Sequence, residues 1–167
     1  MPARLHRFAL RCYQRLPTLG RRWVVRTIAP SYTVGAMCVI ERRDGAVLLI
    51  RHSYRSRWGV PGGLLNRREE PADAARREVW EEVGLDVELA GEPAPVVDAV
   101  PQRVDLVYRA RPAAGADLDA VRPVSPEIAE VRWFPPDELP ELQVETTTAL
   151  IALARAANEP RPGWEVA

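Results

Sequence analysis

The segment with the clearest chemical meaning is RREVWEEVGL, residues 76–85, which gathers three carboxylates near the end of an expected helix. Spacings of three and four residues place Glu78, Glu81 and Glu82 on one helical face, where like charges repel by about 0.2–0.5 kcal/mol per pair. Gly84 is typical of the residue just past a helix end, so the helix dipole disfavours the same charges. A hard divalent cation such as Mg²⁺ would neutralise them. The alternative is a solvated acidic face, the commoner meaning of such a cluster.

The helix that carries these glutamates is predicted to begin at Pro71, a favourable first helical position, with Asp73 well placed in the first turn. By helical geometry the glutamates lie within an arc of about 100°, beside an apolar stripe that we expect to face the core. The stripe consists of Ala72, Ala75, Val79 and Val83.

Strands and a second helix are expected around this segment. Residues 32–40 are β-rich, and Asp44 and Gly45 before the apolar run 46–50 predict a hairpin. Strands flanked by helices predict an α/β layered domain. The remaining expected elements are strands at 86–91, 103–111 and 128–134, a short helical turn at 135–139, and a helix at 144–157 with an apolar face of Leu150, Ile151, Leu153 and Ala154.

A basic amphipathic helix is predicted near the N-terminus, because the apolar residues of 5–16 recur at helical spacing with arginines beside them. Pro17 and Gly20 are expected to end it, and residues 21–30 form a second basic, apolar stretch. Such a helix could contact a membrane surface or a nucleic acid. We favour packing against the main domain or a homodimer partner, because amphipathic helices mostly bury their apolar stripe in protein.

The 167 residues, 47% of them hydrophobic, suit one domain with a real core. We divide the chain into a helical extension at 1–30, a main domain at 31–158 and a flexible tail at 159–167. Residues 1–68 contain 14 arginines and two acidic residues, whereas residues 69–167 contain nine arginines and 21 acidic residues. Folded together, these halves could attract a phosphate and hold a metal side by side, or simply neutralise each other.

Cysteine usage and hydropathy predict a cytoplasmic protein. Cys12 and Cys38 lie in apolar surroundings without metal-ligand spacing, so we expect reduced, buried thiols. The longest apolar run before Arg11 is three residues, which is too short for a signal peptide, and no 18 consecutive apolar residues suggest a membrane span.

A longer pattern surrounds the glutamates. Gly63, then Glu69 after five residues, then residues 77–85 after seven more, match every fixed position of the Nudix box. The sequence therefore resembles the Nudix hydrolase superfamily over about residues 32–157, with WGVPGG before the box and the usual closing strand and turn at 127–142.

This resemblance implies a Nudix α/β/α sandwich with a mixed β-sheet and a site that binds Mg²⁺ or Mn²⁺. By that likeness the cation is coordinated by Glu78, Glu81, Glu82 and the Gly62 carbonyl. Arg77 and Glu69 would pair as a brace that orients the carboxylates. The expected catalytic residues are accordingly Arg77, Glu78, Glu81 and Glu82.

The implied activity is that of a pyrophosphohydrolase, which cleaves a nucleoside diphosphate linked to another moiety by water attack at phosphorus. We expect Glu82 to take the water proton, with Glu127 and Glu130 as candidates outside the box for base or ligand. Two alternatives stay open. One is an enzyme that acts on an RNA 5′ end with the arginine-rich N-terminus as its handle; the other is a non-catalytic module that senses a nucleotide.

Substrate contacts are expected in the polar, aromatic loop before the box, whose side chains could bind phosphate and stack a base. The candidates are Arg51, His52, Tyr54, Arg55, Arg57 and Trp58. Equally, Trp58 could belong to the core and the arginines could be solvated.

Two positions depart from the usual pattern of the resemblance. Many relatives carry glutamate where Asn66 stands and glycine where Arg68 stands. An extra acidic ligand is therefore missing here, and we expect a stiffer and more basic loop.

Overall fold

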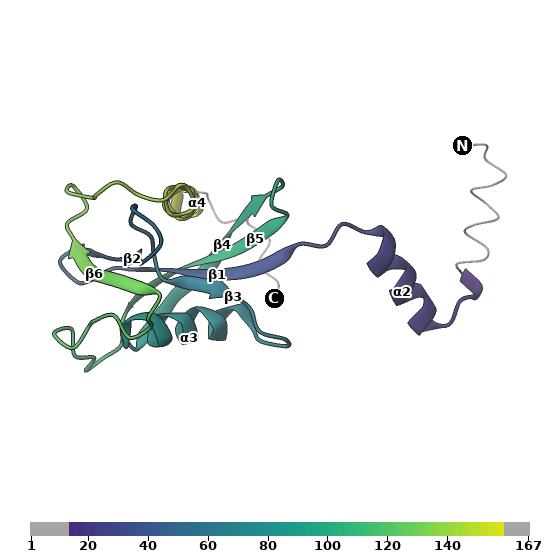
Figure 1. Cartoon of the computed structure of the whole chain (residues 1–167), viewed down its shortest axis with the longest axis horizontal. Helices are drawn as coiled ribbons and strands as arrows, with labels where there is room; N and C mark the ends of the chain where they lie inside the picture. Colours follow the sequence, from purple (N-terminus) through teal and green to yellow (C-terminus); the bar gives the residue numbers. More distant parts are fainter. Residues whose placement is uncertain (1–13, 159–167) are drawn as a thin grey trace. The chain divides into compact units, whose positions relative to one another are not determined.

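The chain divides after Tyr32 into two parts that are described separately. A computed structural model describes residues 14–158 (Figure 1). The first part contains helix α2 (Thr18–Ile28). The second contains β1 (Thr33–Ile40), β2 (Val47–His52), β3 (Gly62–Leu64), α3 (Pro71–Val83), β4 (Val87–Asp98), β5 (Arg103–Pro112), β6 (Ile128–Phe134) and α4 (Val144–Asn158).

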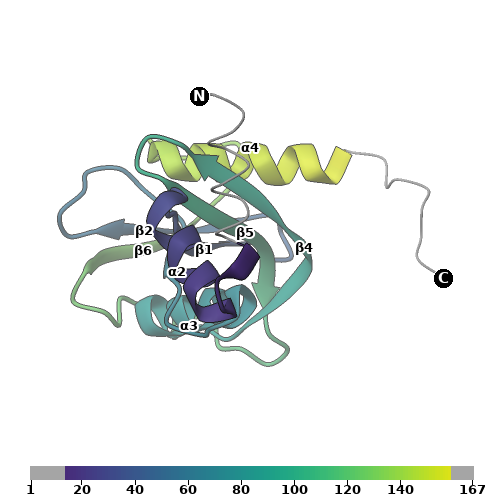
Figure 2. The same ribbon diagram turned by 90° about the vertical axis from the view of Figure 1, so that its right-hand side faces the viewer.

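The strands of the second part form two sheets. Four strands pair in the order β3-β1-β5-β4, and this sheet is mixed, as expected, because β1 and β5 are parallel while the other pairs are antiparallel. β2 and β6 form a separate antiparallel pair. Helices α3 and α4 lie on opposite sides of the strands, as both views show (Figures 1 and 2). The predicted α/β/α sandwich is therefore confirmed.

Alternating side chains of β1 and β2 build a core on each face, because successive residues of a strand point to opposite sides. The layer beneath α3 contains Cys38, Ile40, Leu48, Ile50, Val79 and Val83. The layer beneath α4 contains Met37, Val39, Val47, Leu49, Ala149 and Leu153. Burial raises the pKa of the Cys38 thiol to about 12, so this free cysteine behaves as an inert core residue.

Helix α3 begins and ends as its sequence predicts. Pro71 occupies the first turn, and Gly84 follows the last residue with φ 69°, a left-handed conformation that glycine adopts without strain. The Gly84 N–H donates to the Trp80 carbonyl at 3.0 Å. The core stripe is confirmed at Ala75, Val79 and Val83, which are completely buried together with Ala74, while Ala72 is partly buried.

The predicted hairpin is right at its turn and wrong in its strands. Gly45 has φ 86° and donates its N–H to the Arg42 carbonyl at 2.9 Å. A single bridge then joins Glu41 to Val47, after which β1 pairs with β3 and β5 while β2 pairs with β6. Both strands are apolar on both faces, and a two-stranded ribbon would leave them largely exposed. Separate partners bury them between two helices.

Helix α4 forms where predicted, but its buried face is rotated. Ile151 is 47% exposed and Ala154 is also exposed, whereas Thr146, Ala149 and Leu153 are buried. The Thr146 hydroxyl accepts the Val60 N–H at 3.2 Å, so a polar side chain belongs to the inner face. A helical turn was expected at residues 135–139, and the structure has a single turn there, in which the Glu138 N–H donates to the Pro135 carbonyl at 3.1 Å.

The first part of the chain corrects one boundary. The helical residues before Pro17 end there as expected, but Gly20 lies inside α2 and ends nothing. The predicted amphipathic stripe before residue 14, together with Cys12, lies outside the described residues, as does the tail at 159–167. Within residues 14–158, no helix has the length and apolar character needed to cross a membrane.

Replacing Leu49 by alanine should lower the free energy of unfolding by about 2–5 kcal/mol, because Leu49 is completely buried and its truncation leaves a cavity. Val97→Ala on β4 is the control: Val97 is 64% exposed, so its effect should stay within about 0.5 kcal/mol. Denaturant unfolding measures both, and equal effects would contradict the assigned core.

Candidate active site

Arg77 holds three carboxylates beside helix α3. Its Nε and Nη2 donate to the two oxygens of Glu69 at 2.7 and 2.9 Å, and its Nη1 donates to Glu78 at 2.7 Å and to Glu81 at 3.1 Å. Nη2 also donates to the Leu64 carbonyl at 3.2 Å. The Glu69 contact is the bidentate arrangement that makes guanidinium–carboxylate pairs strong. Together these partners raise the pKa of Arg77 further above its usual value, so one cation offsets the repulsion between three anions.

Glu69 is fixed from its other side by the loop that precedes α3. Its Oε2 accepts the Asn66 N–H at 2.7 Å, and its own N–H donates to the Asn66 carbonyl at 3.2 Å. The Arg77 guanidinium, helped by the Asn66 N–H, lowers the pKa of Glu69 to about 2. Arg68 in this turn has φ 66°, a conformation that costs a non-glycine residue on the order of 1–3 kcal/mol. The loop thus keeps a shape suited to glycine although an arginine stands there.

Gly62 and Gly63 let the chain pass close to the glutamates. A Cβ on Gly63 would lie 2.4 Å from Glu78 Oε1, and a Cβ on Gly62 would lie 2.5 Å from the Ala36 carbonyl oxygen. Neither position accepts a side chain without movement of its surroundings. Because β3 pairs these glycines with β1, the loop is fixed to the central sheet.

Glu82 lies apart from the Arg77 cluster and is 8% exposed. Its Oε2 accepts the Gly62 N–H at 3.1 Å, and its Oε1 lies 3.7 Å from His52 Nε2. Burial raises the pKa of Glu82, and the His52 imidazole and the Gly62 N–H oppose that shift. Sequence analysis placed His52 among the loop candidates and missed its contact with Glu82, since no local pattern relates the two segments.

The donor set fits a hard divalent cation. Glu78, Glu81 and Glu82 offer carboxylate oxygens from one helix, and the glycine at position 63 leaves room beside Glu78. Within residues 14–158, no three acidic, histidine or cysteine side chains converge as a preformed metal centre. One oxygen of Glu78 and one of Glu81 accept from Arg77 instead, so a bound cation and the guanidinium would share these two carboxylates.

The predicted substrate-binding arginines are paired with carboxylates and are therefore neither free nor merely solvated. The pairs are Arg51 with Glu130, Arg55 with Glu145 at 3.2 Å, and Arg57 with Glu141 at 2.6 Å. Arg55 also donates to Gln143 Oε1 at 2.9 Å.

The two aromatic candidates of this loop differ in exposure. Trp58 is partly buried and meets the Phe134 ring edge-on with centroids 4.9 Å apart, so it packs in the core, as the alternative interpretation had it. Tyr54 is 65% exposed and contacts the His52 ring at a centroid distance of 5.2 Å. Tyr54, Arg55 and Arg57 line a hollow of about 300 Å³ with residues 143–145, and the Tyr54 contact links this hollow to Glu82 through His52.

The two candidates outside the box lie near the end of β2. Glu130 lies on β6, opposite Arg51 of β2. Its carboxylate accepts a hydrogen bond from Arg51 and lies 2.7 Å from the Arg132 guanidinium. The hydrogen bond from Arg51 is the main cause of the lowered pKa of Glu130, and Arg132 lowers it further. Glu130 is therefore a weak base. Glu127 is exposed, and its carbonyl accepts the Ser53 N–H at 2.8 Å.

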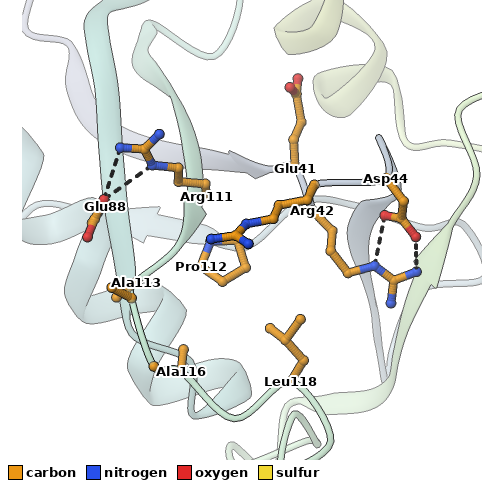
Figure 3. Close-up of a pocket in the computed structure, with 12 residues that line it drawn as sticks. Glu41, Arg42, Asp44, Glu88, Arg111, Pro112, Ala113, Ala116 and Leu118 are labelled. Atoms are coloured by element: carbon orange, nitrogen blue, oxygen red, sulfur yellow. Dashed lines mark hydrogen bonds and ion pairs between the residues drawn. The ribbon is translucent and has the colours of Figure 1, made fainter.

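A larger hollow of about 740 Å³ lies beyond the ends of β1 and β5 (Figure 3). Ala113, Ala116 and Leu118 line it, together with two ion pairs, Arg42 with Asp44 and Arg111 with Glu88, and with Glu41 and Arg43. No glutamate of the box lines this hollow, whereas the glycine loop beside them pairs with residues 35–37 of β1. The candidate active site therefore lies at the glutamates.

Known proteins resemble this chain over most of its length. A MutT-like protein from Streptomyces ambofaciens is 35% identical over 119 residues, which cover 71% of this chain and 74% of that protein. A protein from Mycobacterium tuberculosis, named as a candidate 8-oxo-dGTP diphosphatase, is 31% identical over 160 residues, covering 81% of this chain and 74% of that protein.

A solved structure shares the fold of this chain. The crystal structure of a NUDIX hydrolase from Nitrosomonas europaea superposes with a TM-score of 0.66 at 27% identity and covers 78% of this chain and 76% of that one. The family description of the NUDIX domain matches residues 31–164, which include every strand and both helices of the sandwich. The chain therefore belongs to the Nudix hydrolase family.

Proposed function

We propose that this protein is a metal-dependent diphosphatase of a small nucleotide, cleaving a nucleoside diphosphate linked to another moiety by water attack at phosphorus. The observation that carries the proposal is the division of the carboxylates: Arg77 holds three of them, while Glu82 is buried beneath the Gly62 N–H. Clustered carboxylates suit a hard cation, and a buried carboxylate among them suits proton transfer.

Mg²⁺ or Mn²⁺, when bound, supplies the positive charge that neutralises phosphate oxygens and makes a water more acidic. Glu78, Glu81 and Glu82 would hold it, with the Gly62 carbonyl as a further oxygen. Glu82 is also the carboxylate to which we assign the proton of the attacking water. As the water oxygen bonds to phosphorus, the anhydride P–O bond breaks and the leaving phosphate departs as an anion.

The hollow beside Tyr54 supports a small substrate. Its volume of about 300 Å³ is at the lower end of the range for ligand pockets. The exposed Tyr54 ring suits stacking, and Arg55 and Arg57 offer N–H groups to phosphate or hydroxyl oxygens. The name of the Mycobacterium tuberculosis relative makes 8-oxo-dGTP the first nucleotide to test.

An RNA 5′ end is the second candidate substrate. The 14 arginines of residues 1–68, against two acidic residues, favour contact with a polyanion. Binding through such contacts weakens steeply as salt rises, which a single small nucleotide does not show to the same degree.

The protein should hydrolyse one class of small nucleotide in Mg²⁺ or Mn²⁺, and EDTA should abolish turnover. The panel contains (d)NTPs, 8-oxo-dGTP, ADP-ribose, nucleotide sugars and 5′-triphosphorylated RNA. Glu82→Gln should lower kcat by about 10²–10⁴-fold, the usual contribution of a general base. Preference for the RNA with steep salt dependence would establish the second candidate, and nucleotide binding without turnover would establish a sensor.

Arg77→Gln should raise the Mg²⁺ concentration needed for activity, or lower the activity itself, by about 10–100-fold. The reason is that Glu69, Glu78 and Glu81 lose their shared counter-charge. Arg76→Gln is the matched control on the same helix: Arg76 lies 3.3 Å from Asp73 and is about half exposed, so activity should change by less than about twofold. Initial rates over a Mg²⁺ titration measure both variants. Equal responses would show that the Arg77 cluster has no role in the reaction.

A further inference from the structure

Glu82 is the one glutamate of the box that Arg77 does not hold. Within the described chain its carboxylate has two polar neighbours, the Gly62 N–H at 3.1 Å and His52 Nε2 at 3.7 Å. The two side chains are nearly closed off from solvent, with exposures of 14% for His52 and 11% for Glu82. A main-chain N–H holds one oxygen, so the imidazole is what faces the other.

Backbone contacts hold His52 in place. It ends β2 at a β-bulge, pairs with Ile128 of β6, and accepts the Arg55 N–H on its carbonyl at 3.1 Å. The next residue, Ser53, donates its N–H to the Glu127 carbonyl at 2.8 Å. The imidazole is therefore presented to Glu82 from a strand and not from a free loop.

The hydrogen-bonding capacity of the imidazole gives the contact a direction. His52 Nδ1 is buried and has no hydrogen-bond partner among the described residues. An ionised carboxylate only accepts, so the contact with Glu82 is attractive when Nε2 carries a hydrogen. At 3.7 Å it is longer than a hydrogen bond. Hydrogen bonds within active sites are often this long before substrate binds and shorten in the complex.

We propose that His52 is a positioning residue for Glu82, orienting through Nε2–H the one carboxylate that Arg77 leaves unheld. The assignment rests on the proposed metal and base role of Glu82. It divides the orientation of the box glutamates between two elements: Arg77 of α3 acts on Glu78 and Glu81, and His52 of β2 acts on Glu82.

Two amides test this assignment. In His52→Gln the side-chain nitrogen reaches the place of Nε2, whereas in His52→Asn it reaches only the place of Nδ1, although both variants are polar and smaller than histidine. Ser53→Ala is the control for disturbance of the strand end, because Ser53 is exposed and its main-chain N–H is retained. Mn²⁺ binding to each protein without substrate is measured by electron paramagnetic resonance, together with thermal unfolding and with kcat and KM at saturating Mn²⁺.

His52→Asn should weaken Mn²⁺ binding by about 10–100-fold, the usual effect of removing a group that orients a metal ligand, while KM at saturating Mn²⁺ changes less than about threefold. His52→Gln and Ser53→Ala should stay within about threefold of the natural protein. Unchanged Mn²⁺ affinity in His52→Asn overturns the proposal. An equal loss of Mn²⁺ affinity in His52→Asn and His52→Gln also overturns it. So does a nitrogen directly coupled to Mn²⁺ in the pulsed electron paramagnetic resonance spectrum, because it would make His52 a metal ligand.

The natural protein separates this inference from the proposed function. If it neither binds Mn²⁺ nor turns over any nucleotide, the proposed function fails. If it does both and the His52 variants behave like it, only the positioning role fails. Should His52→Asn not fold, the affinity of His52→Gln decides: about tenfold weaker binding in a folded protein overturns the proposal.

Discussion

The carboxylates around the second half of α3 repel one another, and the means by which this repulsion is offset shapes the whole site. On an exposed helix such pairs cost a few tenths of a kcal/mol each, and the cost rises as water is excluded. Arg77 offsets the charges of Glu69, Glu78 and Glu81. Glu82 has no arginine and is buried, an arrangement that disfavours its charge. Its burial is understandable when that charge, or its proton, is used in the reaction.

The same constraint explains the glycines beside the helix. Gly62 presents its N–H to Glu82, and Gly63 leaves space that a side chain would take from Glu78. The turn at Asn66 fixes Glu69 so that it can meet Arg77 from outside the helix. Loop and helix therefore act as one unit, which the β3–β1 pairing attaches to the central sheet.

That unit could be predicted from the sequence because its determinants are local. Pro71 and Gly84 specify the ends of α3, and the family resemblance implied that Arg77 pairs with Glu69 within a single loop and helix. Contacts between distant segments could not be predicted. The arginines at 55 and 57 gave no sign of partners that lie 84 to 90 residues later. The inner face of α4 was misplaced because hydropathy counts Thr146 as polar, although the Val60 N–H satisfies it.

Because β1 and β2 belong to different sheets, the candidate site is built on two separate parts of the fold. Glu82 stands on a helix packed against β1, and His52 stands on β2, which belongs to another sheet. Between these two parts lies an apolar layer that includes Leu48, Ile50, Val79 and Val83. Protein interiors are close-packed, so the thickness of this layer is set by the volumes of its side chains. A methyl group added to or removed from this layer would therefore change the distance between His52 and Glu82 without altering any polar atom.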